Sequence, residues 1–131
     1  MKSKTLAVLA GTLLLTSAAP TWAQSLNDDW YSIKDAKELQ DLYSNKTFRG
    51  SGWVGHYRAD GRGILIVGDL KPEPRTWKVQ GSDQVCAYKS DGSVSCYRYM
   101  RNRQHAERLI LTDVKSGMTY LFTVEEGIPN F

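Results

Sequence analysis

The stretch Val85-Cys-Ala-Tyr-Lys-Ser-Asp-Gly-Ser-Val-Ser-Cys96 contains both cysteines of the chain, separated by nine residues around an Asp-Gly pair. Asp-Gly between two β-rich runs indicates a β-hairpin, because glycine adopts the positive φ that such turns require. If Ser90-Asp91-Gly92 forms a three-residue loop, pairing outward from it places Cys86 opposite Cys96. That pair is non-hydrogen-bonded, with Cα atoms about 4.5 Å apart, within disulfide range. A two-residue Asp-Gly turn of type I′ would instead place the cysteines on opposite faces of the hairpin.

Metal and redox roles for the cysteines fit the sequence less well. A thioredoxin-like redox pair is spaced Cys-x-x-Cys, and zinc needs three or four ligands. The two histidines, His56 and His105, stand in unrelated contexts and complete no ligand spacing. We therefore predict a structural disulfide between Cys86 and Cys96, with no metal ion and no cofactor. Closing a loop of this length stabilises a domain by about 3 kcal/mol in the chain-entropy model.

The N-terminus predicts export, which a disulfide requires. Lys2 and Lys4 precede an apolar run from Leu6 to Leu15, and small residues with a proline follow as far as Ala23. This is the pattern of a secretory signal peptide, and the apolar run is too short to cross a bilayer of about 30 Å. We expect residues 1–23 to be removed, leaving a periplasmic or secreted protein of one domain, residues 24–131, with no transmembrane segment.

The charge of the mature chain excludes some classes of partner. Lys2 and Lys4 leave with the signal peptide, so 15 of the 17 basic residues remain against 14 acidic ones. A chain so close to neutral gives no reason to expect a nucleic acid or a membrane surface as partner. The remaining length suits one small core, and we expect a monomer.

Outside the hairpin, the pattern predicts one helix and further strands. Two overlapping capping boxes, Ser32 to Asp35 and Asp35 to Glu38, precede apolar residues at helical spacing and predict a helix over 33–44. Glycine and proline pairs divide the rest into β-rich runs at 52–59, 63–68, 75–80, 84–89, 93–100, 107–112 and 118–125. The predicted fold class is all-β, an antiparallel meander of about seven strands with one N-terminal helix, closed into a small barrel or left as a curled sheet.

Alternation within these runs assigns their faces. In the last run, one face is more apolar than the other, and a tryptophan and its second neighbours share a face in the run 75–80. We expect the first face to be buried; its residues are Met118, Tyr120, Phe122 and Val124. Trp77 shares its face with Val79 and Arg75.

Four stretches resemble a family of exported bacterial proteins. They are Leu42 to Phe48, Gly55 to Arg62, Arg75 to Val79, and Val85-Cys86 followed by Ser95 to Arg98. Their order is similar to that of the family grouped as domain of unknown function 995: a leading helix, an Asp-Gly hairpin, a tryptophan strand and two cysteines. The resemblance covers about residues 36–124. It implies export to a bacterial periplasm and a compact β fold, and no activity, because the family is uncharacterised.

The segment Tyr97 to Arg108 is the most basic part of the mature chain, with four arginines and one glutamate. Arginine forks beside tyrosine rings suit carboxylates, phosphates or sugars. We define the candidate binding surface as Tyr97, Arg98, Tyr99, Arg101 and Arg103. The alternative is a solvated edge strand whose charges discourage aggregation. As a binding surface, it would take an envelope component or another protein as partner.

A second short resemblance concerns Ser116-Gly117-Met-Thr-Tyr120. It is similar to the Ser-Gly-x-x-Tyr loop of periplasmic inhibitors of C-type lysozyme, which are small disulfide-bonded β-barrels. The resemblance implies that Ser116, Gly117 and Tyr120 form an inhibitory loop. An ordinary Ser-Gly turn before a strand tyrosine explains the same residues.

The sequence offers no catalytic residue. Gly50-Ser51-Gly52 is too short for a nucleophile elbow, and the carboxylates have no pairing that suits acid and base roles. His56 lies near Asp60, as a strand residue near its own turn does. We therefore expect a protein that is not an enzyme, acting as a periplasmic binding or envelope-associated module; the alternative is an inhibitor of a cell-wall hydrolase.

Overall fold

The computed structural model describes residues 29–131, of which Tyr31–Phe131 forms one compact unit. The predicted signal peptide, residues 1–23, lies outside the described residues. The elements of the described part are β3 (Trp30–Ser32), α3 (Ala36–Tyr43), β4 (Lys46–Gly50), β5 (Trp53–Tyr57), β6 (Arg62–Val67), β7 (Glu73–Gln80), β8 (Gln84–Lys89), β9 (Val94–Asn102), β10 (Arg108–Asp113) and β11 (Thr119–Glu126).

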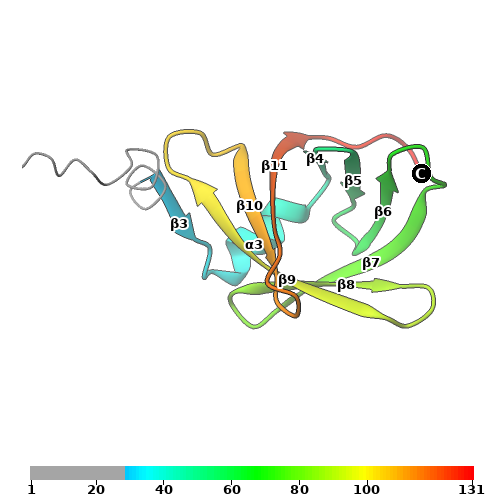
Figure 1. The fold of residues 1–131 in the computed structure, drawn as a ribbon, viewed down its shortest axis with the longest axis horizontal. Coiled ribbons are helices and arrows are strands. Elements are labelled where there is room, and N and C mark those ends of the chain that lie inside the picture. The colour runs from blue at the N-terminus through cyan, green and yellow to red at the C-terminus, as the bar shows by residue number, and fades with distance from the viewer. Residues whose placement is uncertain (1–28) are drawn as a thin grey trace, which may run out of the picture. The chain divides into compact units, whose positions relative to one another are not determined.

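Eight strands, β4 to β11, form a closed antiparallel barrel, and β3 lies beside β9 as an additional strand (Figure 1). From β4 to β10, each strand pairs with the next one along the chain, and β11 pairs back with β4. The predicted all-β class is confirmed. Of the two forms left open by the sequence, the closed barrel is the one observed, and closure removes the free sheet edges that a curled sheet would expose.

The β8–β9 hairpin has the register that the three-residue loop predicts. The N–H of Lys89 donates to the carbonyl of Ser93 over 2.9 Å, and Gly92 has φ +89°. Cys86 stands opposite Cys96 with Cα atoms 4.0 Å apart, and the two form a disulfide. The disulfide joins β8 and β9 in the predicted register.

Three elements differ from the sequence prediction, and one of them is strand β3 at Trp30–Ser32, which was not predicted and lies beside β9. The helix begins at Ala36 rather than residue 33, because the second capping box is the one used: Asp35 is the N-cap and accepts the N–H of Glu38 at 3.0 Å. Ile33, which the first box would have placed in the helix, is buried and donates its N–H to the carbonyl of Tyr99. The strand Lys46–Gly50 was not predicted, although it pairs with both β5 and β11 and closes the barrel.

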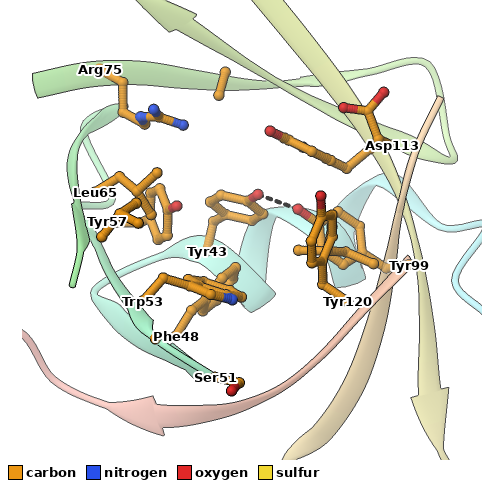
Figure 2. Close-up of a pocket in the computed structure, with 15 residues that line it drawn as sticks. Tyr43, Phe48, Ser51, Trp53, Tyr57, Leu65, Arg75, Tyr99, Asp113 and Tyr120 are labelled. Atoms are coloured by element: carbon orange, nitrogen blue, oxygen red, sulfur yellow. Dashed lines mark hydrogen bonds between the residues drawn. The ribbon is translucent and has the colours of Figure 1, made fainter. Parts of the chain in front are cut away.

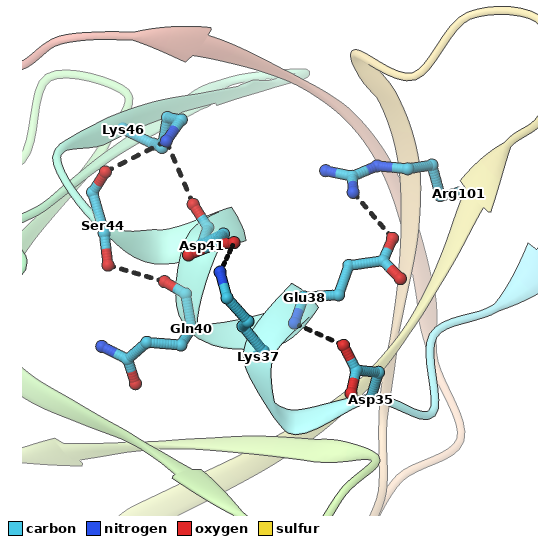
Figure 3. A network of polar contacts seen from close by, with 8 residues as sticks. All are labelled: Asp35, Lys37, Glu38, Gln40, Asp41, Ser44, Lys46 and Arg101. Carbon is cyan, nitrogen blue, oxygen red and sulfur yellow. Dashed lines mark hydrogen bonds and ion pairs between the residues drawn. The ribbon is translucent and has the colours of Figure 1, made fainter.

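Polar contacts hold both ends of α3 in place (Figure 3). At the C-terminal end, the Ser44 hydroxyl donates to the carbonyl of Gln40, and Lys46 Nζ donates to the carbonyl of Asp41 at 3.0 Å. In the first turn, Arg101 Nη1 of β9 donates to Glu38 at 2.8 Å. These contacts satisfy backbone groups that an isolated helix of eight residues would leave exposed, and they join the helix to the barrel.

The helix lies where β4 begins, and it fills that end of the barrel. Its apolar side chains belong to a cluster of buried residues contributed by the strands around it. We call this the closed end and define it by Ile33, Leu39, Leu42, Trp77, Val85 and Leu109, none of them more than 5% exposed. The helix is short, and Tyr43 in its last turn is the one helix residue that lines the cavity at the other end of the barrel, where the remaining side chains come from the strands and the loop after β4.

Candidate functional site

A cavity of about 350 Å³ lies inside the barrel, with Tyr43 from the last turn of α3 in its lining, and opens to solvent. Every barrel strand contributes to its wall, and seven of the fifteen lining residues are aromatic (Figure 2). The lining residues are Tyr43, Phe48, Ser51, Gly52, Trp53, Tyr57, Leu65, Val67, Arg75, Ala87, Tyr97, Tyr99, Leu111, Asp113 and Tyr120. Apolar, concave walls with a few polar groups are the usual composition of a small-molecule site.

The floor of the cavity is a layer of buried aromatic rings centred on Tyr43 of α3. Its ring lies 4.7 Å from that of Tyr57, 4.9 Å from that of Phe48 and 5.9 Å from that of Tyr99, measured between centroids. The hydroxyls of Tyr43 and Tyr99 are hydrogen-bonded to each other. Burial raises the pKa of Tyr57 to about 12, and burial also raises the pKa values of Tyr43 and Tyr99 well above the ordinary range. All three tyrosines are therefore neutral at physiological pH.

Two strand glycines, Gly55 and Gly63, leave the space that the Tyr57 ring occupies. A Cβ on Gly55 would come within 2.7 Å of the Tyr57 ring, and a Cβ on Gly63 would also come within 2.7 Å of it. Neither glycine has a positive φ, so the requirement is for space and not for backbone conformation. The ring consequently packs against the backbone of β5 and β6, and the centre of the cavity stays open.

Arg75 is the one charged side chain in the wall that is almost fully buried. It lies on β7, where alternation places it on the same inward face as Trp77, and its side chain is 6% exposed. Nη2 donates to Glu73 at 2.6 Å. Nε has no hydrogen-bond partner, the single buried side-chain nitrogen or oxygen in the described part of the chain of which this is true. Figure 2 shows the guanidinium directed into the cavity.

The mouth of the cavity is formed by lining residues that stay in contact with solvent. Val67 at the end of β6 is 44% exposed, and Tyr120 at the start of β11 is 40% exposed. Asp113 lies on a different side of the cavity from Arg75 (Figure 2). One oxygen of Asp113 accepts the N–H groups of Lys115 and Ser116, at 2.8 and 3.0 Å. The open end thus offers apolar contact with one cationic and one anionic group.

The residues of the candidate binding surface do not lie together in the structure. Tyr97 and Tyr99 line the cavity. The arginines lie elsewhere, each with a different neighbour: Arg98 pairs with Asp83 at 3.4 Å, Arg101 pairs with Glu38, and Arg103 lies over the ring of Tyr31 at 5.3 Å. Alternation along β9 places Tyr97 and Tyr99 on one face and Arg98 on the other, and the cavity lining shows that the tyrosine face is the inner one. The arginines do not converge on one ligand position.

Ser116 and Gly117 lie at the tip of the β10–β11 hairpin, beside the mouth of the cavity. The loop is held by side-chain contacts to its own backbone, because Asp113 accepts two N–H groups and the Ser116 hydroxyl accepts the N–H of Met118 at 3.2 Å. Gly117 has φ +77°, which favours glycine. Tyr120 follows on β11 and also lines the cavity. The three residues of the predicted inhibitory loop therefore form one exposed, ordered hairpin end.

The histidines lie outside the cavity lining. The Thr47 hydroxyl donates to the carbonyl of Gly127 at 2.8 Å, so it accepts from the Nδ1–H of His56 at 2.9 Å. Burial lowers the pKa of His56, which favours this neutral form. His105 lies in the exposed β9–β10 loop. Within residues 29–131, no group of three His, Cys, Asp or Glu side chains is placed to hold a metal ion.

Sequence reasoning did not name Arg75 as a site residue. A signal existed in its spacing: Arg75 alternates with Trp77 and Val79, so a charged residue occupies an inward position of a strand. Trp53 and Tyr57 carry a similar signal, since they flank Gly55 on one strand face. Only closure of the barrel shows that these positions, far apart in sequence, surround one cavity.

Comparisons of the chain with protein-family models, with curated proteins and with solved structures found no match. The two family resemblances therefore stay predictions from short motifs. Among residues 29–131, no helix combines the length and the apolar character needed to span a membrane.

Proposed function

We propose that this protein is a non-enzymatic binding module of the bacterial envelope, and that its binding site is the cavity at the open end of the barrel. The observation that carries the proposal is the cavity itself, about 350 Å³ with an aromatic lining. Barrels of eight strands have an interior just wide enough to be filled by side chains or to hold one small ligand. In this barrel, the helix fills only the closed end.

The energetics favour a ligand with a hydrophobic body. Burying a side chain the size of phenylalanine contributes about 1.5 to 3 kcal/mol, and aromatic pairs contribute further. Trp53, Phe48 and Leu65 supply the apolar contacts, and rings already packed against their neighbours lose little freedom when a ligand enters. The site is therefore suited to a small, largely apolar molecule.

A neutral aromatic probe, N-phenyl-1-naphthylamine, tests the proposal through the rise of its fluorescence on leaving water. We expect saturable binding to one site per chain in the purified protein. The variant Ala87→Phe fills the cavity from its wall and should weaken binding by about tenfold or more, the loss expected when a ring is no longer buried. Leu65→Trp fills the cavity from another strand and gives an independent blocking variant.

Val94→Phe is the matched control. Val94 lies in the same hairpin as Ala87 but is 51% exposed and does not line the cavity. It should bind the probe as the unmodified protein does. If neither blocking variant weakened binding while near-ultraviolet circular dichroism showed both to be folded, the cavity would not be the site.

A second candidate, inhibition of a cell-wall hydrolase, is favoured by the order of the β10–β11 loop. A loop already held by Asp113 and Ser116 loses little conformational entropy when it enters an active-site cleft. Exposed Met118 and Tyr120 next to it offer apolar contact. C-type lysozyme titrated with the protein should then lose activity, and Tyr120→Ala should restore it. Full lysozyme activity at micromolar excess of the unmodified protein would exclude this candidate.

A further inference from the structure

The ligand chemistry can be inferred from the one charged group in the cavity wall whose hydrogen-bonding capacity is incomplete. Arg75 is nine-tenths buried, yet its Nε–H has no acceptor among the described residues. A buried donor without a partner costs free energy, more so on a charged group. Evolutionary exchange of arginine for an apolar residue would remove that cost, so the position indicates a use for the donor.

The ion pair with Glu73 does not account for the charge of Arg75. Glu73 is 43% exposed, and its other oxygen lies 3.7 Å from Lys89 Nζ. One carboxylate therefore stands between two cations, Arg75 in the cavity wall and the half-exposed Lys89, so the three groups together carry a net positive charge. Positive potential and a free N–H donor together favour an anion.

The geometry selects a planar anion with an apolar body. Arginine presents its donors in one plane, which matches a carboxylate better than a point charge does. The Tyr57 ring, which lines the cavity together with Arg75, packs against the backbone at Gly55 and Gly63. The rest of the lining near it is apolar, including Leu65 and Ala87.

Asp113 limits the ligand to a single anionic group. Its carboxylate lies on a different side of the cavity, so a second negative charge on the ligand would approach it in a site with restricted access to water. A dicarboxylate or a compact dianion would be repelled there. A molecule with one carboxylate and an uncharged far end meets no such repulsion.

We propose that the barrel cavity binds a small aromatic or apolar monocarboxylate, with Arg75 as the residue that binds the carboxylate. This inference rests on the proposed function, because it names the chemistry of the ligand for the same cavity. It assigns anion recognition to Arg75, which lines the cavity, and not to Arg98 and Arg101 of β9, which do not line it.

Isothermal titration calorimetry with two ligands of one shape tests it. Naphthalene-2-carboxylate carries the anion, and naphthalene-2-carboxamide is its neutral counterpart. At pH 7, we expect the carboxylate to bind at least about tenfold more tightly than the amide, the ratio that a charge-assisted hydrogen bond supplies. Arg75→Gln should weaken the carboxylate by about 10- to 100-fold and change amide binding by no more than about threefold.

Arg98→Gln is the matched control, since Arg98 lies on the barrel exterior beside Asp83 and is half exposed. It should leave the binding of both ligands unchanged. Arg75→Lys keeps the charge without the planar fork, and it replaces Arg75→Gln if that variant proves unfolded by circular dichroism. We expect it to retain only part of the preference for the carboxylate.

The outcomes separate this inference from the proposal on which it rests. Equal affinity for carboxylate and amide in the unmodified protein would overturn carboxylate recognition and leave a binding cavity. Equal weakening of both ligands by Arg75→Gln would show that Arg75 shapes the cavity only, which also overturns it. Absence of binding for both ligands and for N-phenyl-1-naphthylamine would instead count against the cavity as a binding site.

Discussion

The two ends of the barrel are built from the same strands but differ in what fills them. At the closed end, Leu39 and Leu42 of the helix pack among strand side chains, and the Glu38 carboxylate accepts from both Arg101 and Tyr31. At the open end, Tyr43 is the one helix residue in the cavity lining, the Tyr120 ring is partly exposed to solvent, and the Nε–H of Arg75 has no partner among the described residues. The comparison shows that one short helix divides an eight-stranded barrel into a packed core and a cavity.

The largest effect should come from the layer of tyrosines that separates the two ends. Burial raises the pKa of Tyr57 to about 12 and raises those of Tyr43 and Tyr99 further above the usual value. Above pH 10 the unfolded chain loses these protons while the folded chain keeps them, so the free energy of unfolding falls as pH rises. The fall is about 1.4 kcal/mol per pH unit for Tyr57 up to its folded pKa, and Tyr43 and Tyr99 make it steeper.

Urea unfolding between pH 8 and pH 12 measures this slope, and Tyr57→Phe should reduce it by about 1.4 kcal/mol per pH unit. Stability at pH 8 is the control, because all three tyrosines are protonated there in both states. If the free energy of unfolding of Tyr57→Phe fell with pH as steeply as that of the unmodified protein, the Tyr57 ring would not be part of the buried layer. The layer would then not separate the two ends of the barrel as described.

The next effect separates stability from binding. Replacing both Cys86 and Cys96 by alanine removes the disulfide and should lower the free energy of unfolding by about 3 kcal/mol. Alternation places the bond on the outer face of the β8–β9 hairpin, opposite to cavity residues Ala87 and Tyr97. We therefore expect the double variant, measured well below its unfolding midpoint, to bind N-phenyl-1-naphthylamine with unchanged affinity. A large loss of affinity in a folded variant would mean that the hairpin positions the cavity wall as well.

These contrasts also show what the sequence could predict. The disulfide register followed from local rules, since Gly92 and the count of residues to each cysteine determine it. Strand β4 was not predicted, because Lys46–Gly50 is short, follows a helix directly and ends in glycine. It is a strand because it pairs with β5 and β11. Local pattern cannot supply partners that lie far away in the chain.

The site was predicted less well than the fold for a related reason. Alternation on β9 grouped Tyr97 with Tyr99 and separated both from Arg98, and that grouping is the one observed. It could not tell the inner face from the outer one, because both carry large side chains with polar groups. The inward position of Arg75 was visible as a break in an apolar face, but its meaning required the cavity.

The smallest predicted effect compares one arginine at each end of the barrel. Replacing each by methionine should change the free energy of unfolding in opposite directions. Arg101→Met removes the donor to Glu38 and to the carbonyl of Ala106, contacts of 2.8 and 2.9 Å, and should destabilise the protein by about 1 to 2 kcal/mol. Arg75→Met removes the Nε–H that has no partner together with the Nη2 contact to Glu73, which is 43% exposed and stays near Lys89, so it should be neutral or stabilising by about 1 kcal/mol. Urea unfolding at pH 7 compares the two identical substitutions directly. Equal destabilisation by both would mean that Arg75 is a structural residue like Arg101. Changes of opposite sign in the free energy of unfolding would mean that Arg75 lowers the stability of the protein, as expected for a residue whose role is to bind a ligand.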